Sequence, residues 1–234
     1  MSEWALKRFW KEAEVEETDT GFAIALDGRA VKTPAKAGLV VPTRAMAQAI
    51  AAEWDAQTDQ IDPRLMPFTR SANAAIDKVR LQQAEVARML ADYGDADLLC
   101  YRAEDPQELV ARQAAIWDPA LDWAAEALGA RLYPRVGIIH AAQDTGALTN
   151  LSDRVHAQTP FQLAAFHDLV TLSGSLVLGF AAAYGWRDAE EVWRMSRLDE
   201  LWQQEQWGRD DEAVAAANIK RAAFVHAKSF YDIC

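Results

Sequence analysis

Residues 169–184 read LVTLSGSLVLGFAAAY and form the most apolar run of the chain. The run is shorter than the roughly 20 residues that a helix needs to cross a bilayer. It also contains Thr171, Ser173 and Ser175, and Asp168 comes directly before it. These features predict a buried central helix, opened by Pro160 and ended by a Gly-Trp pair, and no insertion into a membrane.

Helical patterns lie on both sides of this run, from about Thr69 nearly to the end of the chain. Upstream, Thr43 is a suitable N-cap for a helix in which Met46, Ile50 and Trp54 recur every four residues on one face. Further helices are expected from Pro106 to beyond Asp118-Pro119, over residues 145–158 and 189–207, and from Asp210 toward Tyr231. The pattern is typical of a helical bundle.

The first forty residues have a different pattern, which indicates strands. Phe22–Leu26 and Arg29–Thr33 are separated by Asp27-Gly28. An Asp-Gly pair between two such runs is a strong hairpin signal, because a type I′ turn needs a positive φ at both central residues. We therefore predict an α+β N-terminal domain with β-hairpins (residues 1–75), followed by a mainly α helical bundle (residues 76–234).

Charge and cysteine content restrict the possible partners and compartments. The chain has 24 basic and 35 acidic residues among 234, which gives a net charge of -11. This balance argues against nucleic acid and anionic membrane surfaces as partners, because both attract clustered Lys and Arg. Met1–Trp4 does not resemble a signal or transit peptide, and two cysteines suit a reducing compartment. The expectation is a soluble, monomeric, cytoplasmic protein, or one of the mitochondrial matrix in organellar relatives.

A search for chemistry finds no recognisable catalytic or cofactor-binding pattern. The glycine-rich loops that cradle phosphates and the paired ligands of metal sites are both missing, so neither a cofactor nor a metal is expected. His167, Asp168 and Ser173 allow a hydrolase triad to be imagined. Because helical neighbours point in different directions, we expect that His167 and Asp168 do not orient one another.

The segment 189–207 has aromatic side chains on two sides when it is placed on one continuous helix. One broad arc should pack on the bundle and contains Val192, Met195, Leu198, Leu201 and Trp202. Trp193, Glu200 and Trp207 are spaced by sevens and fall on another side, flanked by Gln203 and Gln204. Either a second helix covers this side, or it is a partner site in which tryptophans surround a polar group.

Glu200 distinguishes between these two interpretations. A buried carboxylate without a partner is costly, so a covered Glu200 needs an internal cation. Arg197 lies three residues earlier and is close enough to pair with it on a helix. On an uncovered side, the cation can come from another protein.

These residues resemble the C-terminal signature of the ATP-twelve chaperones, a family that assists assembly of the F-type ATP synthase head. The signature residues are Ser196–Glu200, Gln203 and Trp207-Gly208. Other segments agree in order, and the similarity extends from about residue 7 to residue 210. The other matching segments are Leu26–Arg29, Val31–Pro34, Val41–Arg44, Ala52–Asp55, Asp97–Arg102 and Trp117–Pro119.

The resemblance implies an orthogonal helical bundle and a function without catalysis. It implies transient binding to the ATP synthase alpha subunit, at the surface that the beta subunit later covers, so that the alpha subunit does not aggregate. It assigns the glutamate of the signature, Glu200, to partner binding. Around it we expect Asp199, Trp193, Gln203 and Trp207 to contribute, with the tryptophans shielding a pair between Glu200 and a basic group of the client.

Two other functions remain open from the residues. The carboxylates around Glu200 could serve a small-molecule enzyme with its site in a cleft between the two domains. The chain could also be a permanent subunit of a complex, but its acidic balance favours an independent protein.

Overall fold

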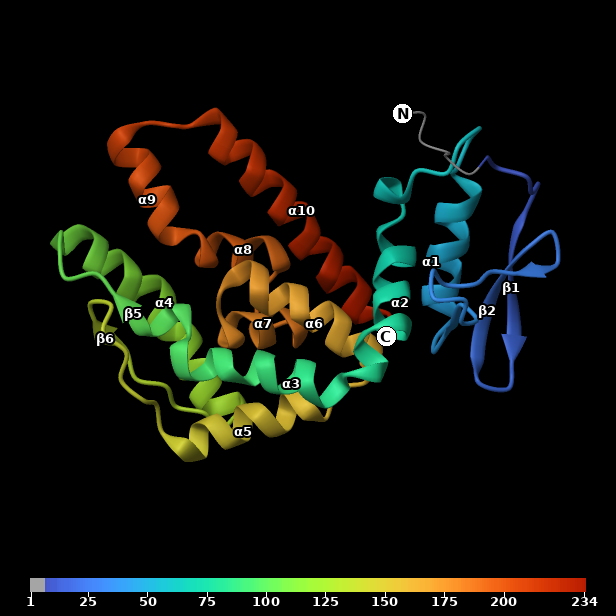
Figure 1. Cartoon of the computed structure of the whole chain (residues 1–234). Helices are drawn as coiled ribbons and strands as arrows, with labels where there is room; N and C mark the ends of the chain where they lie inside the picture. The colour runs from blue at the N-terminus through green and yellow to red at the C-terminus, as the bar shows by residue number, and fades with distance from the viewer. Residues whose placement is uncertain (1–6) are drawn as a thin grey trace. The chain divides into compact units, whose positions relative to one another are not determined.

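The structure, a computed structural model, describes residues 7–234, so Met1–Trp4 lie outside the described residues (Figure 1). The chain divides into two compact units. The N-terminal unit comprises residues up to Gln83 together with the segments 159–164 and 229–234, and the helical unit comprises residues 84–158 and 165–228. The sequence suggests a single boundary at residue 75. That division leaves out the segments 159–164 and 229–234, which are ends of helices that belong to the N-terminal unit.

The N-terminal unit contains a four-stranded antiparallel sheet built around its second strand. The strands are β1 (Ala13–Thr18), β2 (Gly21–Leu26), β3 (Arg29–Ala30) and β4 (Val40–Val41). β2 pairs with each of the other three. Asp27 and Gly28 have φ angles of 47° and 74°, as the predicted turn between β2 and β3 requires. The hairpin prediction is therefore confirmed.

Helices complete this unit and supply its core. They are α1 (Arg44–Asp55), η1 (Pro63–Leu65), α2 (Pro67–Asp77) and η2 (Val79–Leu81). Thr43 caps α1 by accepting a hydrogen bond from the Met46 amide at 3.2 Å, as predicted. Met46 and Ile50 are fully buried, together with Ile24 of β2. The sheet and α1 thus share one apolar layer.

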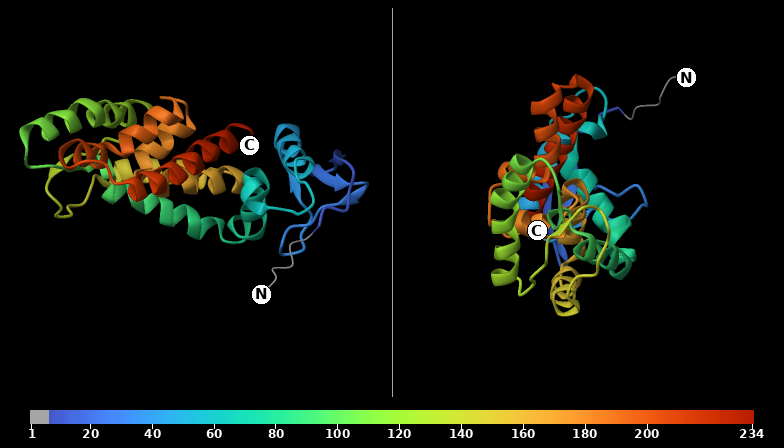
Figure 2. Two further views of the ribbon diagram at one scale, coloured as in Figure 1. Left: turned by 90° about the horizontal axis from the view of Figure 1, so that it is seen from above. Right: turned by 90° about the vertical axis from the view of Figure 1, so that its left-hand side faces the viewer.

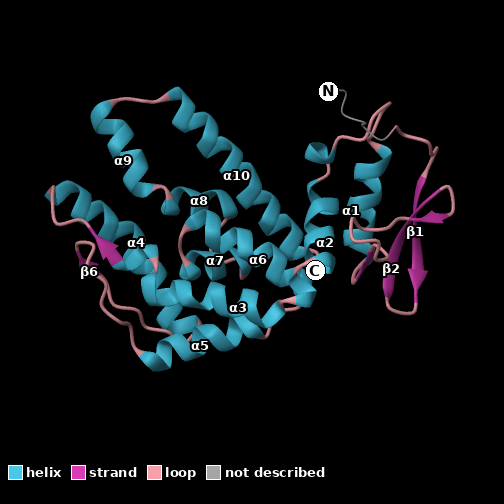
Figure 3. Cartoon of the chain, viewed as in Figure 1, coloured by secondary structure: helices cyan, strands magenta, loops and turns pink. Residues whose placement is uncertain are grey.

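The helical unit is mainly α-helical, as Figure 3 shows, so the predicted fold class is confirmed. Its elements are α3 (Gln83–Ala91), η3 (Asp92–Ala96), η4 (Leu98–Cys100), β5 (Tyr101–Arg102), α4 (Gln107–Ala127), β6 (Arg135–Val136), α5 (Thr145–His156), α6 (Pro160–Ser173), α7 (Leu176–Ala183), α8 (Ala189–Ser196), α9 (Leu198–Trp207) and α10 (Asp211–Asp232). Every residue of α7 is buried, and Phe180 packs on Phe166 with ring centroids 4.6 Å apart. The apolar run that opened the sequence analysis thus lies in the core of the bundle.

Two predicted helices are each broken in two. The helix expected from Pro160 to Tyr184 ends at Ser173, because Gly174 has a φ of 73° and Ser175 then caps α7 by accepting from the Leu178 amide at 3.0 Å. The helix expected over residues 189–207 breaks at Arg197 (φ -102°, ψ 14°), between α8 and α9. Over the described residues, no helix is both long and apolar enough to cross a membrane.

Candidate functional site

The break at Arg197 changes the direction of the segment that carries the predicted partner site. Val192, Met195 and Leu198 are buried, as predicted for the arc that packs on the bundle. Leu201 is 41% exposed, so the prediction that it packs on the bundle is wrong. One helical wheel cannot describe α8 and α9 together, because positions after the break are rotated relative to those before it.

α9 is a helix with little burial of its own. Leu198 is its one buried residue, and Gly208 ends it with a φ of 92°. After Gly208 the chain reverses direction into α10, as the views in Figures 1 and 2 agree. α9 packs beside α4, and pockets lie along both of its long sides. The helix therefore offers two separate surfaces for binding.

The two tryptophans of the predicted site lie in opposite environments. Trp193 is 4% exposed and packs against Phe224 of α10, with ring centroids 5.7 Å apart. Trp207 is 80% exposed. A second helix thus covers Trp193, as one of the two interpretations required, but Trp207 remains open to solvent. The expectation that both tryptophans line one side of a helix is wrong.

Glu200 lies in a notch between α8, α9 and α10. Its carboxylate forms an ion pair with Arg197 at 2.6 Å, although the Glu200 side chain is still 42% exposed. The notch has a volume of about 530 Å³, and Trp193 forms part of its wall. On its far side, Arg221 of α10 donates two hydrogen bonds of 2.6 Å to Glu190 of α8. The intrachain pair considered in the sequence analysis is therefore present.

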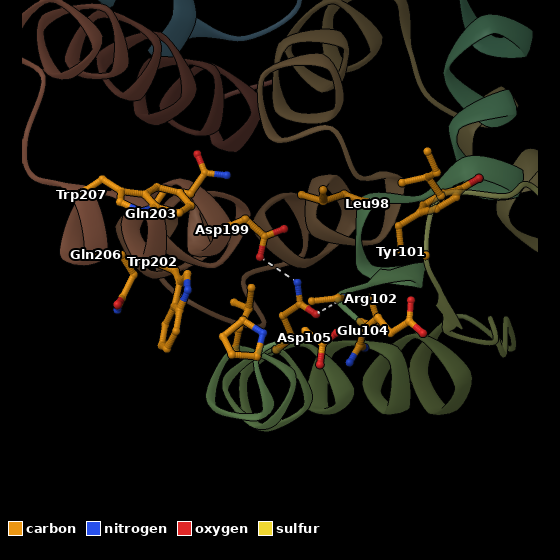
Figure 4. Close-up of a pocket in the computed structure, with 16 residues that line it drawn as sticks. Leu98, Tyr101, Arg102, Glu104, Asp105, Asp199, Trp202, Gln203, Gln206 and Trp207 are labelled. Atoms are coloured by element: carbon orange, nitrogen blue, oxygen red, sulfur yellow. Dashed lines mark hydrogen bonds between the residues drawn. The ribbon is translucent and has the colours of Figure 1, made fainter.

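Asp199, Gln203 and Trp207 line a groove on the other side of α9, which we call the α9 groove (Figure 4). It has a volume of about 640 Å³ and lies between α9, the segment 101–106, the start of α4 and the loop after β6. The five predicted site residues are thus divided, since Trp193 and Glu200 line the notch instead. All the residues that line each pocket belong to the helical unit.

Gln113 connects three walls of the α9 groove. Its side-chain amide donates to Asp199 of α9 at 2.7 Å, and its carbonyl oxygen accepts from the Ala103 amide at 2.8 Å. Figure 4 draws both bonds as dashed lines. Gln113 is 2% exposed and belongs to α4. A buried amide with both ends bonded fixes the position of the Asp199 carboxylate.

A second contact between α4 and α9 involves Arg112, which the sequence analysis did not single out. Arg112 donates to both carboxylate oxygens of Glu205 at 2.9 and 2.8 Å. These hydrogen bonds raise the pKa of the Arg112 guanidinium, which also lies 4.9 Å from the centroid of the Trp202 ring. Trp202 is thereby fixed as part of the groove wall.

The loop between β6 and α5 contributes an apolar tip that the sequence analysis did not identify. Ile138 and Ile139 are 91% and 83% exposed, and Ile138 lines the α9 groove. Asp95 holds the base of the loop by accepting from the Gln143 amide at 2.8 Å and lying 2.9 Å from His140 Nε2. The pair of isoleucines directly after Gly137 was the available signal.

One geometric expectation about catalysis is wrong. His167 Nδ1 lies 2.9 Å from Asp168 Oδ1, so neighbouring residues of one helix do orient one another here. The buried Ser173 hydroxyl, however, donates to the Leu169 carbonyl at 2.6 Å, so it is occupied within its own helix. Among residues 7–234, His, Cys, Asp and Glu nowhere form a group of three that could hold a metal ion.

Comparison with known proteins identifies the family. The family described as ATP12 chaperone protein matches residues 7–125. The mitochondrial protein atp12 of Schizosaccharomyces pombe is 26% identical over 221 residues, which cover 89% of this chain and 76% of that protein. Two solved structures are 48% identical: Atp12 from Paracoccus denitrificans, with a TM-score of 0.95 over 97% of each chain, and a mutant of P. denitrificans Atp12p, with a TM-score of 0.96 over 99% of each chain.

These matches agree with the order of the motifs quoted from the sequence. The family match alone covers half of the chain, and the two solved structures cover nearly all of it. The resemblance stated in the sequence analysis is therefore confirmed: the chain belongs to the ATP12 chaperone family, whose members assist assembly of the ATP synthase.

Proposed function

We propose that this protein is a non-catalytic assembly chaperone that binds the ATP synthase alpha subunit as a monomer and only transiently. It covers the surface that the beta subunit later occupies and so prevents aggregation of the unassembled alpha subunit. Membership of the ATP12 chaperone family supports the general role. The choice of subunit follows from the family resemblance of the segment 196–208.

The observation that carries the proposal is the exposure of α9. Only Leu198 of this helix is buried, and the helix ends in a tryptophan that is 80% exposed. Such an aromatic side chain typically becomes a binding hot spot once a partner covers it. A subunit that waits for its neighbour exposes a partly apolar interface that is prone to aggregate. A few hot-spot contacts of this kind are enough to hold the chaperone on that interface, and they are few enough for the chaperone to be released later.

Glu200 has a defined part in this proposal. In the free protein its carboxylate is neutralised by Arg197 at 2.6 Å but stays partly open to solvent. A basic group of the client can share this carboxylate, because an ionised oxygen accepts several hydrogen bonds. Trp193 contributes indirectly, by forming the buried wall against which Arg197 lies, with 5.7 Å between the guanidinium carbon and the ring centroid.

The test mixes freshly diluted alpha subunit with the protein and follows light scattering. We expect the wild type to suppress aggregation at near-equal amounts, and Glu200→Lys to lose this effect, since the new lysine repels both Arg197 and the client cation. Glu126→Lys is the matched control, because it makes the same charge change at an exposed position of α4. Circular dichroism must show that both variants fold.

Three outcomes would contradict the proposal at different levels. If the wild type leaves alpha-subunit scattering unchanged, the client assignment is wrong. If Glu126→Lys suppresses aggregation as poorly as Glu200→Lys does, the net charge of the protein rather than the notch controls binding of the alpha subunit. If Glu200→Lys unfolds the protein, the residue serves the fold and has no assigned part in client binding.

A further inference from the structure

The α9 groove has apolar surface on two opposing walls. Trp202 and Trp207 belong to α9, and Ile138 belongs to the loop after β6. Ile138 and Trp207 are 91% and 80% exposed, which is unusual for side chains of this size. Apolar groups on both walls of one groove suit an inserted apolar segment better than a flat contact.

The charged groups of the same groove are unbalanced. Glu104, Asp105 and Asp199 line it together with one cation, Arg102. Arg102 is occupied, because it donates to Asp118 at 2.8 Å and to the Leu99 carbonyl at 2.7 Å, and its side chain is only 9% exposed. Within the described part of the chain, no cation pairs with Glu104, Asp105 or Asp199. The groove therefore presents uncompensated negative charge between its apolar walls.

The walls are held in place before any ligand arrives. Gln113 fixes the Asp199 carboxylate, and the pair between Arg112 and Glu205 fixes α9 beside α4. Asp95 secures the base of the loop that carries Ile138. A preorganised groove loses little conformational entropy on binding. These contacts argue for a site with a defined occupant rather than for an incidental depression.

We propose that the α9 groove binds a segment of the client polypeptide in which a lysine or arginine is flanked by apolar side chains. The inference rests on the proposed function and deepens it, because it names the chemistry of the client segment and the side of α9 that receives it. The cation of the segment pairs with the free oxygen of Asp199. Its apolar neighbours pack against Trp207 and Ile138.

The occupant follows from charge complementarity together with apolar surface. A second copy of this chain would bring a net charge of -11 to an acidic groove and be repelled. An arginine is the best match for the site, because its planar guanidinium binds a carboxylate and stacks on an indole ring. The groove is thus expected to prefer arginine to lysine.

The experiment places a photo-crosslinking amino acid at position 138 of the full chain and irradiates it in the presence of the alpha subunit. The matched control has the same amino acid in place of Leu81, which is 74% exposed and belongs to the N-terminal unit. We expect position 138 to crosslink to the alpha subunit and position 81 not to do so. Mass spectrometry should map the crosslink to a segment with an Arg or Lys beside apolar residues.

Substitutions measure the contribution of each wall. Ile138→Asp and Asp199→Asn should each weaken alpha-subunit binding by about tenfold or more, which corresponds to about 1.4 kcal/mol or more for the loss of a central contact. Asn can still accept the hydrogen bond from Gln113, so Asp199→Asn tests the charge with the wall intact. Leu81→Asp should leave binding unchanged.

The outcomes separate this inference from the proposed function. If the wild type holds the alpha subunit while both groove variants bind normally, or position 138 gives no crosslink, the groove assignment fails and the proposed function stands. A crosslink from position 138 to another copy of this chain, or to an acidic segment, also overturns the assignment. If the wild type does not hold the alpha subunit, both proposals fail together.

Discussion

Trp193 and Trp207 illustrate how the same residue type acquires different roles seven positions apart. Trp193 contacts Phe224 within the bundle and also lies beside Arg197, so its indole ring belongs to the core and supports the notch. Trp207 is the last residue of α9 and contacts mainly solvent. The residue type alone could not distinguish these roles, because tryptophan is common both in cores and in binding sites.

Substituting each tryptophan with alanine should separate stability from binding. Trp193→Ala should lower the free energy of unfolding by about 3–5 kcal/mol, since it leaves a large cavity in the bundle. Trp207→Ala should change it by less than about 0.5 kcal/mol but weaken client holding. Urea unfolding and the light-scattering assay measure the two effects. Similar stability losses in both variants would contradict this division.

Other residues of the family-like segments serve the fold. Asp97 is fully buried and accepts hydrogen bonds from the Ser175 hydroxyl at 2.7 Å and from the Leu99 and Val177 amides at 3.0 Å. Burial raises the pKa of its carboxyl group, and these hydrogen bonds oppose the effect. Glu53 similarly accepts from the Phe68 and Thr69 amides at 2.6 and 2.8 Å. Membership of a family motif therefore did not indicate a site in these cases.

At the scale of elements, the sequence predicted the caps and turns well but not the two breaks. Thr43, the Asp-Gly turn and Gly208 act through local geometry that residue type specifies directly. The break at Arg197 involves no glycine or proline, and Trp117 of α4 donates to the Met195 carbonyl just before it at 2.9 Å. Such a break depends on tertiary contacts, which a single sequence does not reveal.

The loop that carries Ile138 should depend on pH through Asp95. The Gln143 amide, helped by His140, lowers the pKa of this carboxyl below its usual value of 3.8. A carboxyl whose pKa is lower in the folded state stabilises that state above its unfolded pKa, and this stabilisation is lost as the pH falls through the lowered value. The loop should therefore remain anchored at neutral pH and loosen in acid.

Hydrogen exchange of the amides in residues 137–143 tests this expectation at neutral pH with Asp95→Ala and Asp153→Ala. Asp95→Ala should speed exchange in the loop and weaken client binding, because the position of Ile138 is no longer fixed. Asp153 is an exposed carboxylate of α5, and its substitution should have no effect on the loop. Equal exchange in Asp95→Ala and the wild type would mean that other contacts hold the loop.

For the whole molecule, charge and exposed apolar surface act together. The net charge of -11 opposes association between copies of the chain, and in our proposal the uncompensated acids of the α9 groove attract a basic segment. Fold class followed from the sequence because hydrophobic periodicity extends over long segments. The groove did not, since its walls come from four segments that are distant along the chain.

Client holding should weaken with salt but not disappear. Raising the ionic strength from about 0.05 to about 0.5 M shortens the screening length severalfold and weakens exposed charge pairs, whereas apolar contacts persist. Titrations of the alpha subunit at several salt concentrations should show a declining affinity with a salt-resistant remainder. Asp199→Asn should reduce the salt dependence. A salt-independent affinity would contradict a role for the acidic groups.

The exposure of α9 along both long sides has a consequence for handover. If a client were bound through a fully enclosed contact, the chaperone would have to release it before the next partner could bind. Because α9 has pockets along both long sides, an incoming partner can contact one side while the client still occupies the other. The exchange of partners can then proceed through a short-lived three-way assembly, in which the client is never left uncovered.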